Sequence, residues 1–357
     1  MIPYGRQTIE DDDVAAVVDV LRSDFLTQGP AVAEFEAALC DVTGARFAVA
    51  VSSGTAALHA ALHAAGIGTG DTVSTSPLSF AASANAARYV GAGVDLVDID
   101  PATLNLRLDA VPDDTDALVA VHYAGLPVDL TAMRRRPRVV VEDAAHALGA
   151  ATPDGPVGNC AHSDLCCFSF HPVKTVTTGE GGAVTTNSPE LAERMRRFRH
   201  HGISKREGDP FWKYDIAEVG YNFRLTDLQA ALGTSQLGKL ERFVSARNDI
   251  AQRYRDAFAD DERIGLPPAA PAGSRHGYHL FPVLVDERDR VFEELRSRGI
   301  GVQVHYVPMY RFTSFDGDPA DFPATEAAFA RLISLPMFPA LTEADQDTVI
   351  ATLREVV

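Results

Sequence analysis

The sequence predicts an α/β protein that has one large domain with a mostly parallel β-sheet and a second, smaller α/β domain at the C-terminal end. Two observations carry this prediction. Up to about residue 190, short apolar runs alternate with alanine-rich helical patterns, the order of elements that builds a parallel sheet covered by helices. Beyond about residue 240, a long charged helix and a new strand–helix unit replace that pattern.

The predicted strands of the large domain are short and rich in valine and alanine, as buried strands are. In chain order they are FAVAV (47–51), DTVST (71–75), VDLVDI (94–99), ALVAVHY (117–123), VVVED (139–143), DLCCFSF (164–170) and GAVTTN (182–187). Together with an N-terminal arm, we expect this domain to occupy residues 1–240.

The C-terminal part begins with the charged helical stretch KLERFVSARNDIAQRYRDAFADD at 239–261. A stretch rich in proline, alanine and glycine follows at 266–273, and then come HLFPVLV and RVFEELRSRGIGVQVHY. A strand pattern followed by a helical one predicts a small α/β domain over residues 241–357.

Composition narrows the functional classes. The chain has 357 residues, 46% of them hydrophobic and 23% charged, and a formal net charge of −17. An acidic chain lacks the basic surface that nucleic-acid binding requires. No apolar run is long enough to span a membrane, and the N-terminus has neither a basic nor an apolar targeting region, so we expect a cytoplasmic protein without a membrane partner. Four cysteines show no metal-ligand spacing, which favours reduced core thiols over a metal centre.

Ligands of α/β sheets gather at the carboxyl ends of the strands, so the residues just past each run are the informative ones. After FAVAV comes SSGTAAL at 52–58, which leads directly into an alanine-rich helix. The amide groups at that helix start, with the Thr55 hydroxyl, can bind a phosphate. The alternative is an ordinary helix cap, which any serine supplies.

The run VVVED ends at Asp143, and His146 lies three residues further along. A carboxylate at the end of a buried strand is costly unless a cation meets it. A metal ion beside His146 or the protonated ring nitrogen of a cofactor would provide that charge.

The third strand end, FSFHPVKTVTTGEGG, carries Ser169, a single lysine at position 174 and three glycines. Lys174 is either an ordinary solvated lysine or an amine whose pKa is lowered by its surroundings so that it becomes a nucleophile. With the phosphate site and Asp143, it completes the set that pyridoxal phosphate (PLP) requires: a Schiff-base lysine, an acid for the pyridine nitrogen and donors for the phosphate.

The whole chain resembles the DegT family of nucleotide-sugar aminotransferases, which are fold-type I PLP-dependent enzymes. The resemblance rests on motifs that occur in the family's order: SSGTAALHAAL, PLSFAASANA, VDIDPATLNL, VHYAGLPVDL, VEDAAHALGA, FSFHPVKTVTTGEGGAVTTN, GYNFRLTDLQAALG, VQVHYVPMY and SLPMFPALTEADQ. Within the family, SDFLTQGP and FHPVKTVTTGEGG are most similar to the C4 aminotransferases of pseudaminic acid biosynthesis.

The resemblance implies roles for individual residues around the cofactor. Lys174 would form the Schiff base and shuttle protons, and Asp143 would pair with the pyridine nitrogen. Phe80 would stack on the ring, and His146 stands where many relatives have a glutamine near the 3-hydroxyl. The phosphate would be held by Gly54, Thr55 and Ser169, and by Asn222 from the other subunit of a homodimer with shared active sites.

For the substrate, the resemblance implies contacts from Phe25 and Gln28 in an N-terminal loop, from Arg224 across the dimer, and from His305 and Tyr306. Packing roles for Phe25 and Tyr306, and a core role for His305, are the alternatives.

The implied reaction transfers the amino group of L-glutamate to a UDP-linked 4-keto-6-deoxy-N-acetylhexosamine, as in UDP-4-amino-4,6-dideoxy-N-acetyl-β-L-altrosamine transaminase. Amination of another keto-sugar nucleotide at C3 or C4, with UDP, dTDP or GDP, stays open. Relatives that dehydrate sugars carry histidine at the lysine position, and a non-catalytic relative should have lost Lys174 or Asp143; this chain keeps both.

Overall fold

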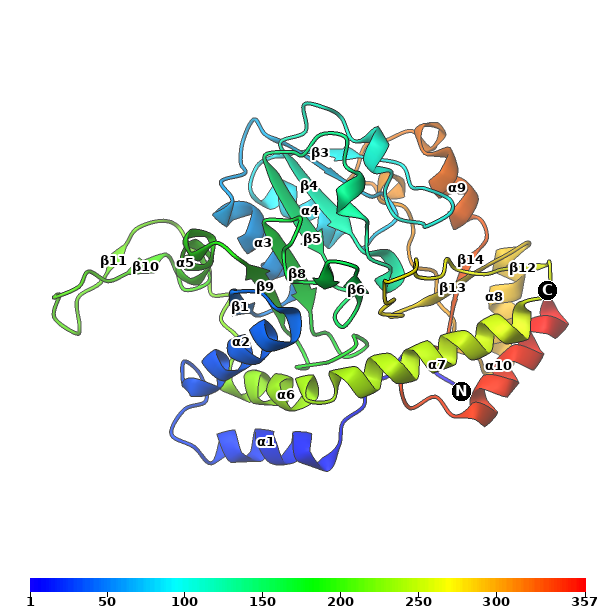
Figure 1. The fold of residues 1–357 in the computed structure, drawn as a ribbon, viewed down its shortest axis with the longest axis horizontal. Coiled ribbons are helices and arrows are strands. Elements are labelled where there is room, and N and C mark those ends of the chain that lie inside the picture. The colour runs from blue at the N-terminus through cyan, green and yellow to red at the C-terminus, as the bar shows by residue number, and fades with distance from the viewer.

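The computed structural model describes residues 1–357 and contains one seven-stranded central sheet (Figure 1). All seven predicted runs contribute a strand to it, which confirms the predicted large sheet. The strand order is β1-β9-β8-β5-β4-β2-β3. The bounds are β1 Phe47–Val51, β2 Thr72–Thr75, β3 Gly93–Leu96, β4 Ala117–Val121, β5 Val139–Asp143, β8 Leu165–Ser169 and β9 Gly182–Thr186.

The strand directions place the functional residues at one edge of the sheet. Strands β8, β5, β4, β2 and β3 pair in parallel, and only β9 is antiparallel to its two neighbours. The carboxyl ends of β1, β5 and β8 therefore lie at the same edge as the start of β9. Strands β4 and β5 are buried along their whole length, which explains why their sequences are almost entirely apolar.

Helices cover both faces of this sheet. Helix α3 (Gly54–Ala64) packs its alanines against one face, where small side chains permit a close approach. On the other face, Phe35 and Leu39 of α2 pack with Ala230 and Leu237 of α6. The bounds of the α-helices other than α3 are α1 Asp11–Leu21, α2 Pro30–Thr43, α4 Ala82–Tyr89, α5 Pro189–Phe198, α6 Asp227–Leu237, α7 Leu240–Phe258, α8 Arg288–Ser297, α9 Pro323–Phe329 and α10 Glu343–Val356.

Helix α7 connects two hydrophobic cores, and Figure 1 shows it running from beside α6 toward the C-terminal end of the chain. Its first turns contribute Phe243 and Val244 to the core beneath the large sheet. Its later turns contribute Ile250, Tyr254 and Phe258 to the C-terminal core. The division of the chain between residues 240 and 241 stays a prediction.

The C-terminal core is built around a three-stranded antiparallel sheet, β12-β13-β14, with α8 and α10 packed beside it. Its strands are β12 Ile264–Gly265, β13 Phe281–Val285 and β14 Leu332–Leu335. The predicted strand–helix unit therefore appears as β13 and α8. The segment that follows, GVQVHY, forms only an isolated bridge between Gln303 and Ser334.

Two short hairpins lie outside these sheets: β6 (Ala151–Thr152) with β7 (Gly155–Pro156), and β10 (Ile203–Ser204) with β11 (Asp215–Ile216). The second hairpin extends from the body of the molecule as an arm (Figure 1), and Phe211 in it is 93% exposed. No helix is both long and apolar enough to cross a membrane.

Candidate active site

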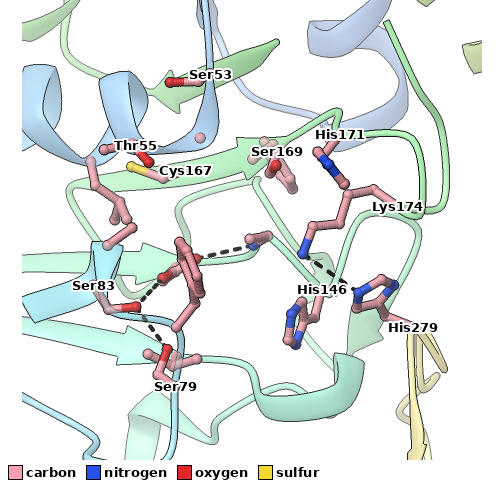
Figure 2. A pocket seen from close by; sticks show the side chains of 18 of the residues that line it. Ser53, Thr55, Ser79, Ser83, His146, Cys167, Ser169, His171, Lys174 and His279 are labelled. Atoms are coloured by element: carbon pink, nitrogen blue, oxygen red, sulfur yellow. Dashed lines mark hydrogen bonds between the residues drawn. The ribbon is translucent and has the colours of Figure 1, made fainter. Parts of the chain in front are cut away.

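A cavity of about 440 Å³ lies at the carboxyl edge of the large sheet. Its lining combines the turns that follow β1, β2, β5 and β8 with residues of the C-terminal part and the N-terminal arm. Figure 2 shows Lys174 pointing into this space, with Ser83 and Ser79 on the opposite side. The three strand ends singled out in the sequence thus meet in one pocket.

The turn after β1 forms a compact anion site at the start of α3. The Ser53 side chain caps the helix by accepting a hydrogen bond from the Ala56 amide at 3.1 Å. The amides of Gly54 and Thr55 precede the first helical hydrogen bond, so they remain available to a ligand. A Cβ atom on Gly54 would lie 2.8 Å from Cβ of Ser169. Only glycine therefore permits this close approach between α3 and the end of β8.

Glycine is also required where β9 begins. A Cβ atom on Gly182 would lie 2.3 Å from the carbonyl oxygen of Ser53, closer than real Cβ contacts come. The glycine-rich return after Lys174 therefore allows β9 to pack directly against the anion site. This is the physical reason for a glycine at the end of the GEGG motif.

Asp143 is a buried carboxylate without a cation from the chain. Its side chain is held by two neutral donors, the Ser83 hydroxyl at 2.6 Å and the Ala145 amide at 3.2 Å. Ser79 hydrogen-bonds Ser83 at 2.8 Å and extends the network (Figure 2). Because a buried anion is costly when it lacks an opposite charge, the pocket favours a ligand that brings a positive group to Asp143.

Lys174 lies in the loop between β8 and β9. A turn positions it, in which its own amide donates to the carbonyl of His171. Its Nζ lies 3.5 Å from Nε2 of His279. Burial lowers the pKa of Lys174 to about 8, opposed by the charge of Asp143 and reinforced by that of Arg247. Lys174 is therefore a partly buried amine that becomes neutral more readily than a solvated lysine does.

Two further aromatic side chains meet beside the lysine. His146 Nε2 hydrogen-bonds the Tyr306 hydroxyl at 3.0 Å, and its ring lies 4.3 Å from that of His279 between centroids. Burial lowers the pKa values of both histidines well below the ordinary value, so both rings are neutral. Nδ1 of His146 is buried and has no hydrogen-bond partner. That nitrogen is free to meet a polar group of a ligand.

These features fit the PLP expected from the sequence. The amides of Gly54 and Thr55 suit its phosphate, and the unpaired carboxylate of Asp143 suits its ring nitrogen. The orphaned Nδ1 of His146 suits a ring hydroxyl. Lys174 supplies the amine for covalent attachment.

The structure brings together nine of the predicted site residues and leaves four outside the cavity. Those lining it are Gly54, Thr55, Phe80, Asp143, His146, Ser169, Lys174, His305 and Tyr306. Those outside are Phe25, Gln28, Asn222 and Arg224. Phe25 and Asn222 are exposed, and Arg224 hydrogen-bonds His200 at 2.9 Å. Their roles toward cofactor and sugar stay predictions.

Several lining residues were not predicted from the sequence. They are Tyr4, Ser79, Ser83, His171, Glu180 and His279, among others. Ser79 and Ser83 both lie in the motif PLSFAASANA, within three residues of Phe80 in the sequence. Their position next to a predicted site residue could have indicated them. Nothing in the local pattern around Tyr4 or His279 indicates a site, because long-range folding brings them to the lysine.

Sequence comparison with known proteins matches the family that the motifs resemble. Residues 7–354 match the sequence model of the DegT/DnrJ/EryC1/StrS aminotransferase family. The spore coat polysaccharide biosynthesis protein SpsC of Bacillus subtilis is 37% identical, over 100% of this chain and 97% of that protein.

Solved structures agree over the same span. PseC of Helicobacter pylori, an aminotransferase involved in the biosynthesis of pseudoaminic acid, superposes with a TM-score of 0.93 at 31% identity, covering 99% of this chain and 98% of that chain. The PLP-form of Spr1654 from Streptococcus pneumoniae superposes with a TM-score of 0.92 at 30% identity, covering 99% and 98%.

Proposed function

The chain belongs to the DegT/DnrJ/EryC1/StrS aminotransferase family, a fold-type I family that uses PLP, and from this premise we propose that it aminates C4 of a UDP-linked 4-keto-6-deoxy-N-acetylhexosamine with L-glutamate as donor. One observation carries the proposal: an amine, an unpaired carboxylate and an anion site face one cavity, at Lys174, Asp143 and the start of α3. The likeness to PseC supports the choice of sugar.

When bound, PLP supplies an electron-withdrawing ring that stabilises negative charge on the carbon that loses a proton. In this proposal Asp143 keeps the ring nitrogen positively charged, with the Ser83 hydroxyl fixing the carboxylate. Lys174 Nζ removes the proton from glutamate and later delivers one to C4 of the sugar. Since its pKa is about 8, the amine can both accept and donate a proton near neutral pH.

We propose that discrimination among sugars comes from polar groups that line the cavity, which include Tyr4, His305 and Tyr306. Leaving one buried hydrogen-bond partner unsatisfied costs about 1–3 kcal/mol, or roughly ten- to a hundredfold in rate. This range is large enough to separate epimers of one sugar.

The substrate is tested by incubating the enzyme and L-glutamate with the L-arabino and the D-xylo epimers of the 4-keto sugar nucleotide. We expect a higher kcat/KM for the L-arabino epimer, with product identity set by mass spectrometry and NMR. A preference for the D-xylo epimer would reassign the pathway. Amination of no keto-sugar nucleotide in a panel of UDP, dTDP and GDP derivatives would refute the function.

We also propose a homodimer in which Asn222 and Arg224 complete the neighbouring site. No arginine of the same protomer lines the cavity, and Asn222 is exposed. Mixing Lys174→Ala with Asn222→Ala subunits should restore up to about a quarter of wild-type activity, because half the dimers are hybrids with one intact site. Hybrids without activity would place Asn222 in its own subunit. The cytoplasmic location stays a prediction.

A further inference from the structure

Arg247 on α7 is a buried cation without an anionic partner. It is 1% exposed, and burial alone lowers its pKa to about 10. Its Nη1 donates to three backbone carbonyls, those of Tyr278 at 3.1 Å, His279 at 3.3 Å and Met337 at 3.0 Å. Its Nε has no partner. Buried charges are normally paired, so this arrangement calls for a role that a neutral side chain could not fill.

Two of the three carbonyls bound by Arg247, those of Tyr278 and His279, belong to the segment that carries the His279 side chain. His279 is 5% exposed, and its Nε2 is 3.5 Å from Nζ of Lys174. A continuous path therefore runs from the guanidinium of Arg247 through the His279 backbone and ring to the lysine amine. Figure 2 shows the imidazole of His279 directed at that amine.

We propose that Arg247 and His279 are positioning residues for Lys174 with opposite effects: the uncompensated charge of Arg247 favours the neutral amine, and the His279 ring accepts a hydrogen bond from the ammonium and holds it in the cavity. The proposal rests on the proposed role of Lys174 as proton carrier. A base that must both take up and release a proton benefits from two such opposed influences.

Other groups also face the lysine and must be considered. Asp143 raises the pKa of Lys174, and Arg247 lowers it. His146 and His305 are neutral because burial lowers their pKa values, that of His305 to about 4. The hydroxyls of Tyr4 and Tyr306, whose pKa values burial raises, are likewise uncharged. Glu180 and His171 also line the cavity, but Asp143 and Arg247 are the two charges that shift the pKa of the amine.

The test measures the protonation of Lys174 in the full-length chain freed of PLP, where the amine is not blocked. Acetic anhydride is applied in trace amounts across a pH series, and mass spectrometry gives acetylation of the peptide that contains Lys174. The midpoint of the pH dependence reports the protonation of the amine. A parallel series records the rate at which added PLP is captured.

Arg247→Met should raise the midpoint by about one pH unit, since a nearby positive charge is removed. His279→Phe should lower it by about half a unit, because the ammonium loses an acceptor. Arg247→Lys should keep the wild-type midpoint. Arg255→Met is the matched control, since Arg255 lies on the same helix, contacts the hydroxyl of Tyr278 at 3.2 Å, and should leave the midpoint unchanged.

Circular dichroism and thermal melting establish that each variant is folded. If Arg247→Met does not fold, the acetylation midpoints of His279→Phe and Arg247→Lys test the proposal. Shifts of Arg247→Met and His279→Phe in the same direction, no shift in either, or an equal shift in Arg255→Met would overturn the proposal. Because no sugar enters the measurement, such a failure leaves the proposed aminotransferase reaction standing; the epimer assay tests that reaction separately.

Discussion

The floor of the cavity and its predicted outer rim differ in how completely one protomer builds them. On the floor, Asp143 accepts a hydrogen bond from Ser83 at 2.6 Å, and Lys174 Nζ lies 3.5 Å from the buried His279 ring. At the predicted rim, Phe25 and Asn222 are exposed and do not line the cavity. The contrast shows that the residues proposed for proton transfer are held in place within one protomer, whereas Phe25 and Asn222, whose ligand contacts are proposed, do not line the cavity of their own protomer.

The largest loss of activity is expected from a substitution of Lys174, on the floor of the cavity. Lys174→Ala should reduce kcat at least about a thousandfold, because the amine is proposed both to hold the cofactor and to move the proton. Lys213→Ala provides the control, since Lys213 pairs with Asp209 at 2.8 Å on the exposed arm. Steady-state assays with glutamate and the keto sugar measure both variants. Substantial turnover by Lys174→Ala would mean that another group carries the proton.

A smaller loss is expected at Asp143. Asp143→Asn keeps the shape of the side chain but removes the charge that should stabilise a protonated ring nitrogen, so the glutamate half-reaction should slow by about a hundredfold. Stopped-flow absorbance of the bound PLP follows that step directly. Ser83→Ala removes only a neutral donor to the same carboxylate and should slow the step less. If Ser83→Ala proves as damaging as Asp143→Asn, orientation rather than charge is the controlling factor.

Asp143 and Lys174 also illustrate which site residues could be predicted from the sequence. Asp143 ends β5, and Lys174 lies in the loop that follows β8, so the parallel sheet brings both to one edge. His279 and Arg247 were missed because their function depends on the packing of the C-terminal part against the large sheet. The predicted strand ALVAVHY is two residues too long: β4 ends at Val121, and the chain turns after His122 into a 3₁₀ segment, Tyr123–Gly125.

A third prediction concerns acid stability of the large domain away from the cavity. His59 on α3 is 8% exposed, and burial lowers its pKa to about 4 from the ordinary 6.5. Between these values the unfolded chain binds a proton that the folded protein does not, so stability falls as the pH drops from 6.5 to 4. His59→Phe should remove up to about 3 kcal/mol of this loss.

Urea unfolding at pH 7 and pH 4.5 measures that difference. Tyr89→Phe is the control, because the Tyr89 ring lies 5.3 Å from that of His59 and the variant keeps the His59 imidazole. If Tyr89→Phe reduces the loss of stability between pH 7 and pH 4.5 as much as His59→Phe does, the acid sensitivity comes from packing and not from protonation of His59.

Substitutions at the predicted rim should have the smallest effects on activity. Gln28 has a positive φ of 58°, so Gln28→Gly removes the side chain without adding backbone strain. This variant and Phe25→Ala should each raise KM for the sugar nucleotide by about tenfold. The glutamate half-reaction should not change. A slower glutamate half-reaction in either variant would show that Phe25 or Gln28 also affects the residues on the floor of the cavity.

The claim that Lys174 carries the cofactor is tested most directly by reducing the PLP-loaded protein with borohydride and mapping the labelled peptide by mass spectrometry. The label should be found on the peptide that contains Lys174, and prior incubation with L-glutamate should abolish it, because the amino group then resides on the cofactor and the lysine is free. A label on any other lysine, or one that glutamate does not remove, would contradict the account.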